Sequence, residues 1–228
     1  MRLNKIAVST AFMISLLLMA CTPPEVDLTG DVLIVSKDGQ NIKLGLIEVN
    51  LVVDTSMQSF IQTKLIAAKS SIELIRPKKE ILQEEYEQLS AEKDLRYEQY
   101  LDNRPSNAYE RRYRDAQKRC DDKREEYLNA LNHLLSYAKG AFYVEGLPTP
   151  LSTTKTDADG KFTLRTKPGR YALVAHSTRK VGDDTEEYYW LVWVKLGRDQ
   201  ATRVVLSNDN LFGTNCTDCI VRSSELAF

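Results

Sequence analysis

Two long stretches of the chain place apolar or aromatic residues at alternating spacings of three and four, the pattern of a helical coiled coil. The first stretch runs over residues 61–89 and the second over 109–137. The segment between them, Asp102–Asn107, contains Pro105, which ends one helix before polar residues that can cap the next. Two helices joined by so short a turn must run antiparallel. The pattern therefore predicts an antiparallel α-helical hairpin, inserted over residues 54–140.

The two arms of this hairpin should change character along their length. Taken as 57–102 and 107–138, they would be about 69 Å and 48 Å long. Pro77 should kink or split the longer arm. Beyond it, residues 78–128 contain 12 basic and 14 acidic residues out of 51, whereas the opposite ends of both arms are largely apolar. We therefore expect a solvated tip and an apolar base, and the balanced signs argue against nucleic-acid binding.

The segments on both sides of the hairpin are patterned as β-strands. Short apolar or alternating runs, separated by turn residues, occur at 31–36, 44–53, 151–156, 161–165, 170–177, 188–194 and 201–206. A hydrophobic content of 43% is ample for a packed core and excludes global disorder. We expect an α+β fold in which 31–53 and 141–206 form one small antiparallel β-sandwich, followed by a polar tail at 207–228.

Residues 1–20 are patterned as an export signal. Arg2 and Lys5 precede a nearly unbroken apolar run at 6–20. As a helix this run would span about 22 Å, which is short of the ~30 Å hydrocarbon core of a membrane. A cleaved secretory signal fits this length better than a permanent transmembrane helix.

The apolar run ends in Leu18-Met19-Ala20-Cys21, which resembles the lipobox of bacterial lipoproteins. The resemblance implies that Cys21 becomes the acylated first residue, with fatty acids such as palmitate, and that 21–30 is a tether. Several acyl chains, at about 0.8 kcal/mol per buried methylene, would hold the protein at a membrane almost irreversibly. In such lipoproteins a residue like Thr22 favours the outer membrane, so we expect a cell-envelope protein facing the periplasm. A plain signal peptide with an incidental cysteine is the alternative.

Three further cysteines would reach a compartment where disulfides persist. Cys216 and Cys219 form a C-x-x-C pair in the tail, which can be a redox dithiol, half of a zinc site or a local disulfide. His133 and His176 are far apart and lack ligand spacing, and the pair does not open a helix after a strand. We favour a local disulfide or two idle thiols, and no metal site. Cys120 lies on the hairpin seam, which predicts a buried free thiol, with an intermolecular disulfide as the alternative.

Two segments after the hairpin, Thr156–Leu164 and Pro168–Leu173, resemble the carboxypeptidase regulatory-like domain, which pairs a T-D-x-x-G-x-F segment with a P-G-x-Y-x-L strand. The resemblance implies a transthyretin-like sandwich of about seven strands, interrupted here by the hairpin, and a non-catalytic folding or interaction module. Residues 30–53 fit its opening strands more loosely. The stretch Asp157-Ala158-Asp159-Gly160 also resembles the start of a calcium loop, but it lacks the later acidic ligand and is interpreted as a hairpin turn.

A second resemblance concerns residues 35–45, which are similar to the first half of the lipoyl-type motif in periplasmic efflux adaptors. Those proteins are often lipoproteins, and a coiled-coil hairpin also splits their lipoyl domain. The resemblance predicts that 31–53 pairs with residues soon after 140. The returning half of the motif is hard to find there, so an efflux-type adaptor is kept as the alternative function.

Motifs for catalysis are missing from the sequence, which contains no HExxH, GxSxG or Gly-rich phosphate loop. Glu186 and Glu187 are adjacent in a predicted strand and should point to opposite faces, which argues against a two-carboxylate site. We expect a non-enzymatic protein without a cofactor, whose sandwich presents the hairpin to an envelope protein partner or as structural support. A thiol–disulfide envelope protein is a weaker alternative, and homo-oligomerisation is left open.

Overall fold

A computed structural model describes residues 24–198, 201–214, 217–222 and 226. These residues form two compact units. The first takes in the described residues up to Asp54, with Thr149–Ser177 and Val192–Asn208. The second takes in Thr55–Pro148, Thr178–Leu191 and the described residues from Asp209 onward.

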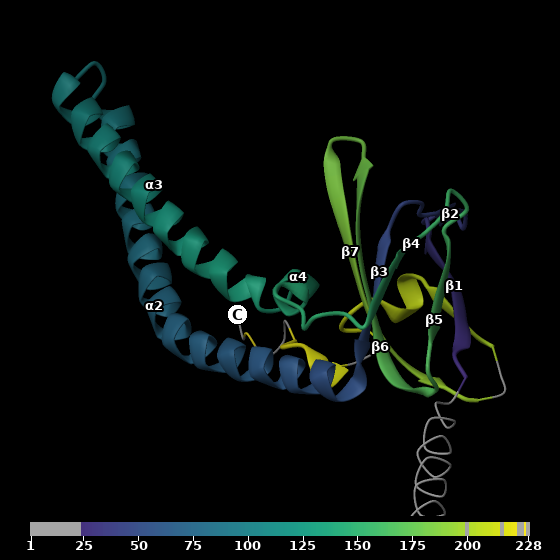
Figure 1. The fold of residues 1–228 in the computed structure, drawn as a ribbon. Coiled ribbons are helices and arrows are strands. Elements are labelled where there is room, and N and C mark those ends of the chain that lie inside the picture. Colours follow the sequence, from purple (N-terminus) through teal and green to yellow (C-terminus); the bar gives the residue numbers. More distant parts are fainter. Residues whose placement is uncertain (1–23, 199–200, 215–216, 223–225, 227–228) are drawn as a thin grey trace, which may run out of the picture. The chain divides into compact units, whose positions relative to one another are not determined.

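The strands form two sheets (Figure 1). One sheet contains β1 (Val26–Val35), β2 (Asn41–Lys43), β5 (Lys161–Thr166) and β8 (Thr202–Leu206). Within it, β1 pairs antiparallel with β2 and β5 and parallel with β8. The other sheet contains, in this order, β4 (Ser152–Lys155), β3 (Glu48–Val53), β6 (Gly169–Val181) and β7 (Asp184–Leu196).

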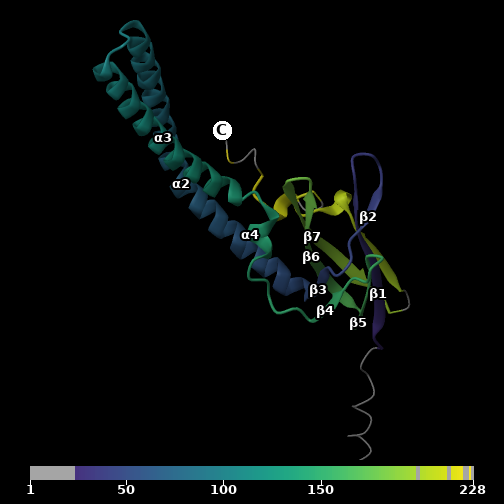
Figure 2. The ribbon, with the colours of Figure 1, turned by 90° about the horizontal axis from the view of Figure 1, so that it is seen from above.

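Two long helices follow β3 in the chain. Helix α2 (Asp54–Asp102) and helix α3 (Asn107–Ser136) lie side by side, as two views agree (Figures 1 and 2). A short helix, α4 (Gly140–Val144), comes after them. The predicted α+β fold is thus confirmed, with two antiparallel-rich sheets and an inserted helix pair.

Helix α2 passes through Pro77 without a break, so the proline does not split the predicted arm. A proline inside a helix removes one backbone hydrogen bond and can be absorbed by bending. The helix curves along its length in Figure 1. Its two ends lie where the sequence places a change of period at Asp54 and a turn around Pro105.

The buried side chains of β1 and β5 come from alternating positions of the strands. In β1, Leu28, Val32 and Ile34 are at most 2% exposed, and Phe162 and Leu164 of β5 are 3% exposed. These residues follow the period of two that places one face of a strand against a core. These two strands are therefore buried on one face, as the alternation in the sequence predicts.

Two predicted boundaries in this unit are corrected. Strand β1 begins at Val26, so residues 26–30 belong to the strand and not to the predicted tether. Their backbone is held in the ladder from Val26 opposite Thr166 onward. Strand β3 begins at Glu48 and not near residue 44, because Leu46 adopts a left-handed φ of 62° and lies 80% exposed in a turn.

The turn at Asp157–Gly160 forms as predicted, but it does not close a hairpin. An oxygen of the Asp157 carboxylate accepts hydrogen bonds from the backbone N–H groups of Asp159 and Lys161, at 2.9 and 2.8 Å. Gly160 supplies a φ of +73°. The strands on either side belong to different sheets, because β4 pairs with β3 while β5 pairs with β1. The turn therefore carries the chain from one sheet to the other.

The pairing of β1 bears on the efflux-adaptor alternative. That arrangement needs residues 31–53 to pair with residues soon after 140. Strand β1 instead pairs with β5 and β8, although β3 does pair with β4 at residues 152–155. The ladder of β1 therefore counts against a split lipoyl domain.

The segment after β8 has a polar composition, but some of its apolar side chains are buried. Its described residues include the short 3-10 helices Asn208–Asn210 and Thr217–Cys219. Ile220, Val221 and Leu226 are 9%, 3% and 1% exposed, so the prediction of a polar tail is wrong for these residues. No helix in the described part of the chain carries an apolar stretch long enough to span a membrane.

Candidate interaction surface

The site residues predicted from the sequence fall mostly outside what the structure describes. Cys21, the predicted lipidation site, and Cys216 both lie outside the described residues. Cys219 is buried and disulfide-bonded, and its pairing with Cys216 stays a prediction. Cys120 is a free thiol, 3% exposed, in agreement with its position on the hairpin seam. Among the described residues, no group of His, Cys, Asp and Glu side chains is placed to hold a metal ion.

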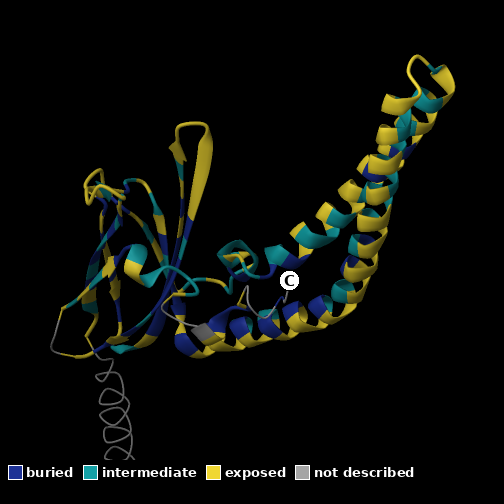
Figure 3. Cartoon of the chain, turned by 180° about the vertical axis from the view of Figure 1, so that it is seen from behind, coloured by how far each residue is buried: buried dark blue, intermediate teal, exposed yellow. Residues whose placement is uncertain are grey.

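Predicted heptad positions supply the buried side chains of the seam between α2 and α3. The buried members that lie opposite each other are Ile72 and Leu82 on α2 and Ala116, Cys120 and Leu134 on α3. Ile61, Leu65 and Ala68 of α2 are also buried, but α3 ends at Ser136 and does not extend beside them. The faces turned toward each other are dark blue or teal in Figure 3, and the outer faces are mostly yellow. The two helices therefore bury their apolar seam against each other.

Lys79 occupies a seam position that was not predicted. It follows Ile75 by four residues and precedes Leu82 by three, and it is only 6% exposed. Its place continues the alternation of three and four without a gap. The methylene stem of a lysine can pack along apolar neighbours, so a basic residue can complete such a seam.

Toward the tip, tyrosines and ion pairs replace aliphatic packing. Tyr86 stacks on Tyr127 with ring centroids 6.0 Å apart, and Tyr113 lies 5.1 Å from Tyr97. Offset and tilted ring pairs of this kind are stabilising beyond their buried area. The tip is therefore joined by contacts between half-exposed side chains.

The charged side chains beside the seam pair across the two helices. Arg119 lies 2.9 Å from Glu92, and Lys123 lies 3.0 Å from Glu85. The hydrogen bond from Arg119 lowers the pKa of Glu92 below its ordinary value. Hydrogen bonds to Glu126 and then to Glu85 raise the pKa of Lys123. The hairpin thus neutralises much of its own charge, which gives a physical reason for the balanced composition of its tip.

One face of α2 outside the seam carries an outer apolar row, which we define as Leu74, Ile81 and Leu95. These side chains are 80%, 57% and 51% exposed. They are separated by seven and fourteen residues, so they lie on one side of the helix, with Gln88 at the intervening position. The row was not predicted, although the regular spacing of apolar residues off the seam is visible in the sequence.

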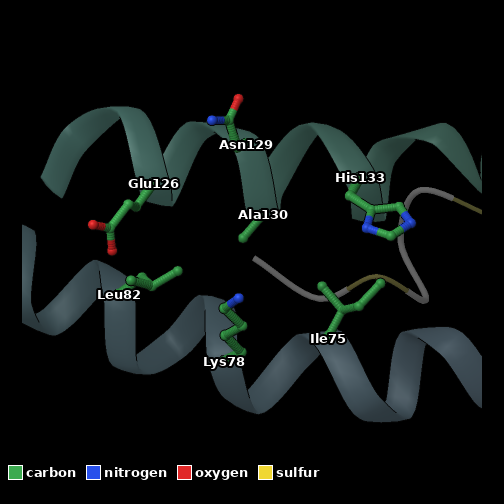
Figure 4. Close-up of a pocket in the computed structure, with 7 residues that line it drawn as sticks. All are labelled: Ile75, Lys78, Leu82, Glu126, Asn129, Ala130 and His133. Atoms are coloured by element: carbon green, nitrogen blue, oxygen red, sulfur yellow. The ribbon is translucent and has the colours of Figure 1, made fainter. Parts of the chain in front are cut away.

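A hollow of about 390 Å³ opens between the two helices on the same side (Figure 4). Ile75, Leu82 and Ala130 form its apolar wall, and Lys78, Glu126, Asn129 and His133 its polar rim. Lys78 follows Leu74 by four residues and precedes Ile81 by three, so it lies on the same face of α2 as both. The outer apolar row and the hollow are therefore neighbours.

A second hollow, of about 360 Å³, lies beside β7. It is lined by Lys139, Gly140, Thr185, Glu187, Tyr189, Leu211 and Phe212. The pKa of Tyr189 is raised mainly by burial and secondly by its hydrogen bond to Glu187. The pKa of Tyr188 is likewise raised mainly by burial and secondly by its hydrogen bond to Glu186. Glu187 lines this hollow, whereas Glu186 accepts the hydroxyl of Tyr188 and lies 3.9 Å from Arg179. Each carboxylate therefore has its own tyrosine partner.

Comparisons with known proteins provide little information about this surface. No family model matches the chain, and no curated protein matches it. A solved structure from Pseudomonas aeruginosa, described as a "putative carbohydrate binding protein", aligns over 83% of this chain and 92% of its own at 12% identity and a TM-score of 0.35. A likeness at that level carries no argument about fold or function. The surface is therefore interpreted from its own geometry.

Proposed function

We propose that this chain is a non-catalytic, lipid-anchored protein of the cell envelope, in which a β-sandwich presents the helical hairpin for protein interaction. The observation that supports the interaction role is the outer apolar row, which lies beside a hollow that opens between the two helices. The sandwich is proposed to be transthyretin-like, with about seven strands, as the resemblance to carboxypeptidase regulatory-like domains implies. The anchor is Cys21, at the outer membrane and facing the periplasm.

The outer apolar row favours binding because folding of the hairpin does not require it. Seam residues and cross-helix ion pairs hold α2 and α3 together, while Leu74, Ile81 and Leu95 remain largely in solvent. Single exposed leucines are common on soluble proteins, but apolar residues aligned on one face beside a concave site are typical of protein contacts. An exposed helix face with spaced apolar anchors is also a recurring mode of recognition.

The residues of the motif that resembles the regulatory-like domain make structural contacts in the first unit, which supports a non-catalytic role. The Thr156 hydroxyl donates to the carbonyl of Leu44 at 2.8 Å and accepts from the N–H of Ile47 at 2.9 Å. Phe162 and Leu164 are buried, and the Tyr171 hydroxyl donates to a backbone carbonyl. These side chains connect strands and fill a core, as expected of a module that serves as a scaffold.

The anchor is tested by replacing the proposed acylated cysteine. Cells that produce Cys21→Ser should yield a protein that takes up no labelled palmitate and is recovered in the soluble fraction of the envelope. The wild type should take up label and sediment with outer-membrane vesicles. Equal fractionation of the two proteins, without label in either, would contradict a lipid anchor and leave a plain signal peptide.

The interaction role is tested by photo-crosslinking in cells from single positions on the hairpin. A crosslinker placed at Ile81, in the outer apolar row, should give one dominant protein adduct. The matched control is Glu87, which is also exposed on α2 but lies about 120° around the helix from Ile81. If both positions give the same weak pattern, the outer apolar row is not a binding surface.

A further inference from the structure

We infer that the hairpin face carrying the outer apolar row is a self-association surface, and that its partner is a second copy of this chain. This inference rests on the proposed interaction role and names its partner. It depends on three properties of the described hairpin: a protrusion beside a hollow, a difference in net charge between the two helices, and the area available.

The first property is self-complementary shape. Leu74 and Ile81 project from α2, and the hollow between the helices begins beside them at Ile75 and Lys78. A two-fold axis gives each copy the same surface, so an isologous contact needs a protrusion and a recess on one face. The apolar wall of the hollow suits an aliphatic side chain. Ile81 of each copy can therefore enter the hollow of the other.

The second property is the distribution of charge along the distal halves of the helices. Residues 80–102 of α2 contain eight acidic and two basic residues, a net charge of −6. Residues 107–128 of α3, which lie opposite them, contain six acidic and seven basic residues, a net charge of +1. Packing α2 on α2 of a second copy would bring like charges together, whereas packing α2 on the nearly neutral α3 avoids this repulsion. The charges therefore select a dimer in which the tips lie at the same end and each α2 faces the other copy's α3.

The third property is the size of the face. From Leu74 to Leu95 the helix rises about 32 Å, and a helix pair is about 20 Å wide. Such a contact would bury roughly 600 Å² on each copy, or roughly 1,200 Å² in total, at the lower end for a specific complex. The expected dimer is therefore weak and reversible, with a dissociation constant on the order of micromolar.

The oligomeric state is measured by analytical ultracentrifugation of the full chain, purified in detergent, over a range of concentrations. The wild type should show a monomer–dimer equilibrium. The double variant Leu74→Glu/Ile81→Glu should weaken the dimer by at least about tenfold, because it places charges in an apolar contact. Leu101→Glu is the matched control: Leu101 is 42% exposed on another face of α2, and its replacement should leave the dissociation constant within about twofold.

Circular dichroism distinguishes lost contact from lost folding, because all three proteins should keep the helix content of the wild type. A wild type that remains monomeric throughout the concentration range would overturn the inference. A double variant that dimerises as well as the control would also overturn it.

The arrangement is tested by a crosslinker at Ile81 in a mixture of isotopically light and heavy chains, which separates links between copies from links within one. The link between copies should land on α3 of the second copy near Asn129, since Leu82 and Ala130 line the same hollow. A link that lands on α2 of the second copy would contradict the charge argument. If the wild type is monomeric while Ile81 captures another protein, the second copy is the wrong partner and the interaction role stands. If Ile81 forms no adduct at all, both proposals are wrong.

Discussion

The first unit and the hairpin tip are held together by different kinds of contact. In the first unit, Leu28, Val32, Val49, Leu51 and Leu173 are fully buried aliphatic side chains from three strands. Along residues 80–128 of the hairpin, the buried side chains are only Leu82, Ala116 and Cys120. The rest of that length is joined by ring pairs and by ion pairs at the edges of the seam.

This difference predicts two kinds of response to mutation. Removing an aliphatic side chain from a close-packed core leaves a cavity and costs the whole unit stability. Removing one half-exposed contact from a long helix pair should loosen the helices near that contact and leave the rest folded. The hairpin can therefore bear an exposed apolar row and a hollow, which a small core could not tolerate.

The largest effect is expected in the core of the first unit. Leu51 of β3 is fully buried opposite Leu173 of β6 in the ladder, so Leu51→Ala should lower the free energy of unfolding by about 2–5 kcal/mol. Denaturant titration followed by the fluorescence of Trp190 and Trp193 in β7 measures this loss. Leu46→Ala is the matched control, because Leu46 is 80% exposed and its truncation should change stability by no more than about 0.5 kcal/mol. Equal losses in the two variants would contradict the assigned core.

The next effect concerns two glycines with the same backbone conformation and different surroundings. Gly160 has a φ of +73°, and a Cβ there would lie 2.6 Å from the carbonyl oxygen of Val32. Gly39 has a φ of +82°, and a Cβ there would meet nothing within 4 Å. Both alanine variants must adopt a left-handed backbone, which costs about 1 kcal/mol, and Gly160→Ala should add a clash that brings the loss to about 2–3 kcal/mol.

Thermal unfolding of the two variants and the wild type checks this order. The Gly160→Ala protein should melt at the lower temperature of the two variants. If Gly39→Ala is destabilised as much as Gly160→Ala, the close approach between the turn and β1 does not contribute to the stability of the first unit.

The hairpin could be predicted from the sequence in more detail than the β-region, for a physical reason. A long helix pair repeats one local rule, so the seam from Ile61 to Tyr137 and the break near Pro105 are visible in residue spacing. A strand depends on distant partners. The apolar residues around Leu46 therefore did not reveal that the chain turns there. The turn at Asp157–Gly160 likewise did not reveal that the strands on either side of it enter different sheets.

The candidate surface was only partly accessible to the same reasoning. The spacing of Leu74, Ile81 and Leu95 is present in the sequence, but a search for one seam per helix overlooks a second row. The hollow beside it depends on how far apart two facing helices lie, which no spacing rule gives. The buried residues Ile220 and Val221 were missed because a polar average over a segment conceals isolated apolar residues that pack singly.

A smaller and local effect is expected at the hairpin tip. The ring of Tyr113 lies 5.1 Å from that of Tyr97 and 6.1 Å from that of Tyr100. Tyr113→Ala should therefore lower the stability of the tip by about 0.5–1.5 kcal/mol for each ring pair, while Tyr113→Phe keeps the rings and most of this stabilisation. Hydrogen exchange measured residue by residue should quicken around the tip and remain unchanged in β3 and β6. Faster exchange in both regions would mean that the tip is coupled to the first unit.

The smallest effect is expected from the ion pair between the helices and appears only at acidic pH. The Arg119 hydrogen bond lowers the pKa of Glu92 below its ordinary value of 4.5. A carboxyl whose folded pKa is lowered adds stability above its unfolded pKa and loses it as the pH falls through the folded value. The protection of the hairpin amides against hydrogen exchange, relative to their slower intrinsic rate in acid, should therefore fall below about pH 4.5, and the Glu92 carboxyl resonance should titrate below its usual range.

Two variants distinguish the effect of the Arg119–Glu92 ion pair from a general loss of hairpin stability in acid. Arg119→Ala should raise the pKa of Glu92 toward its ordinary value, whereas Arg119→Lys keeps a cation and should retain part of the shift. Because the pair is at the surface, added salt should reduce the shift in the wild type and have little effect on the alanine variant. An unchanged Glu92 titration in Arg119→Ala would show that the charges at the tip do not act across the seam. The charge argument for packing α2 on α3 would then lose its support within the hairpin itself.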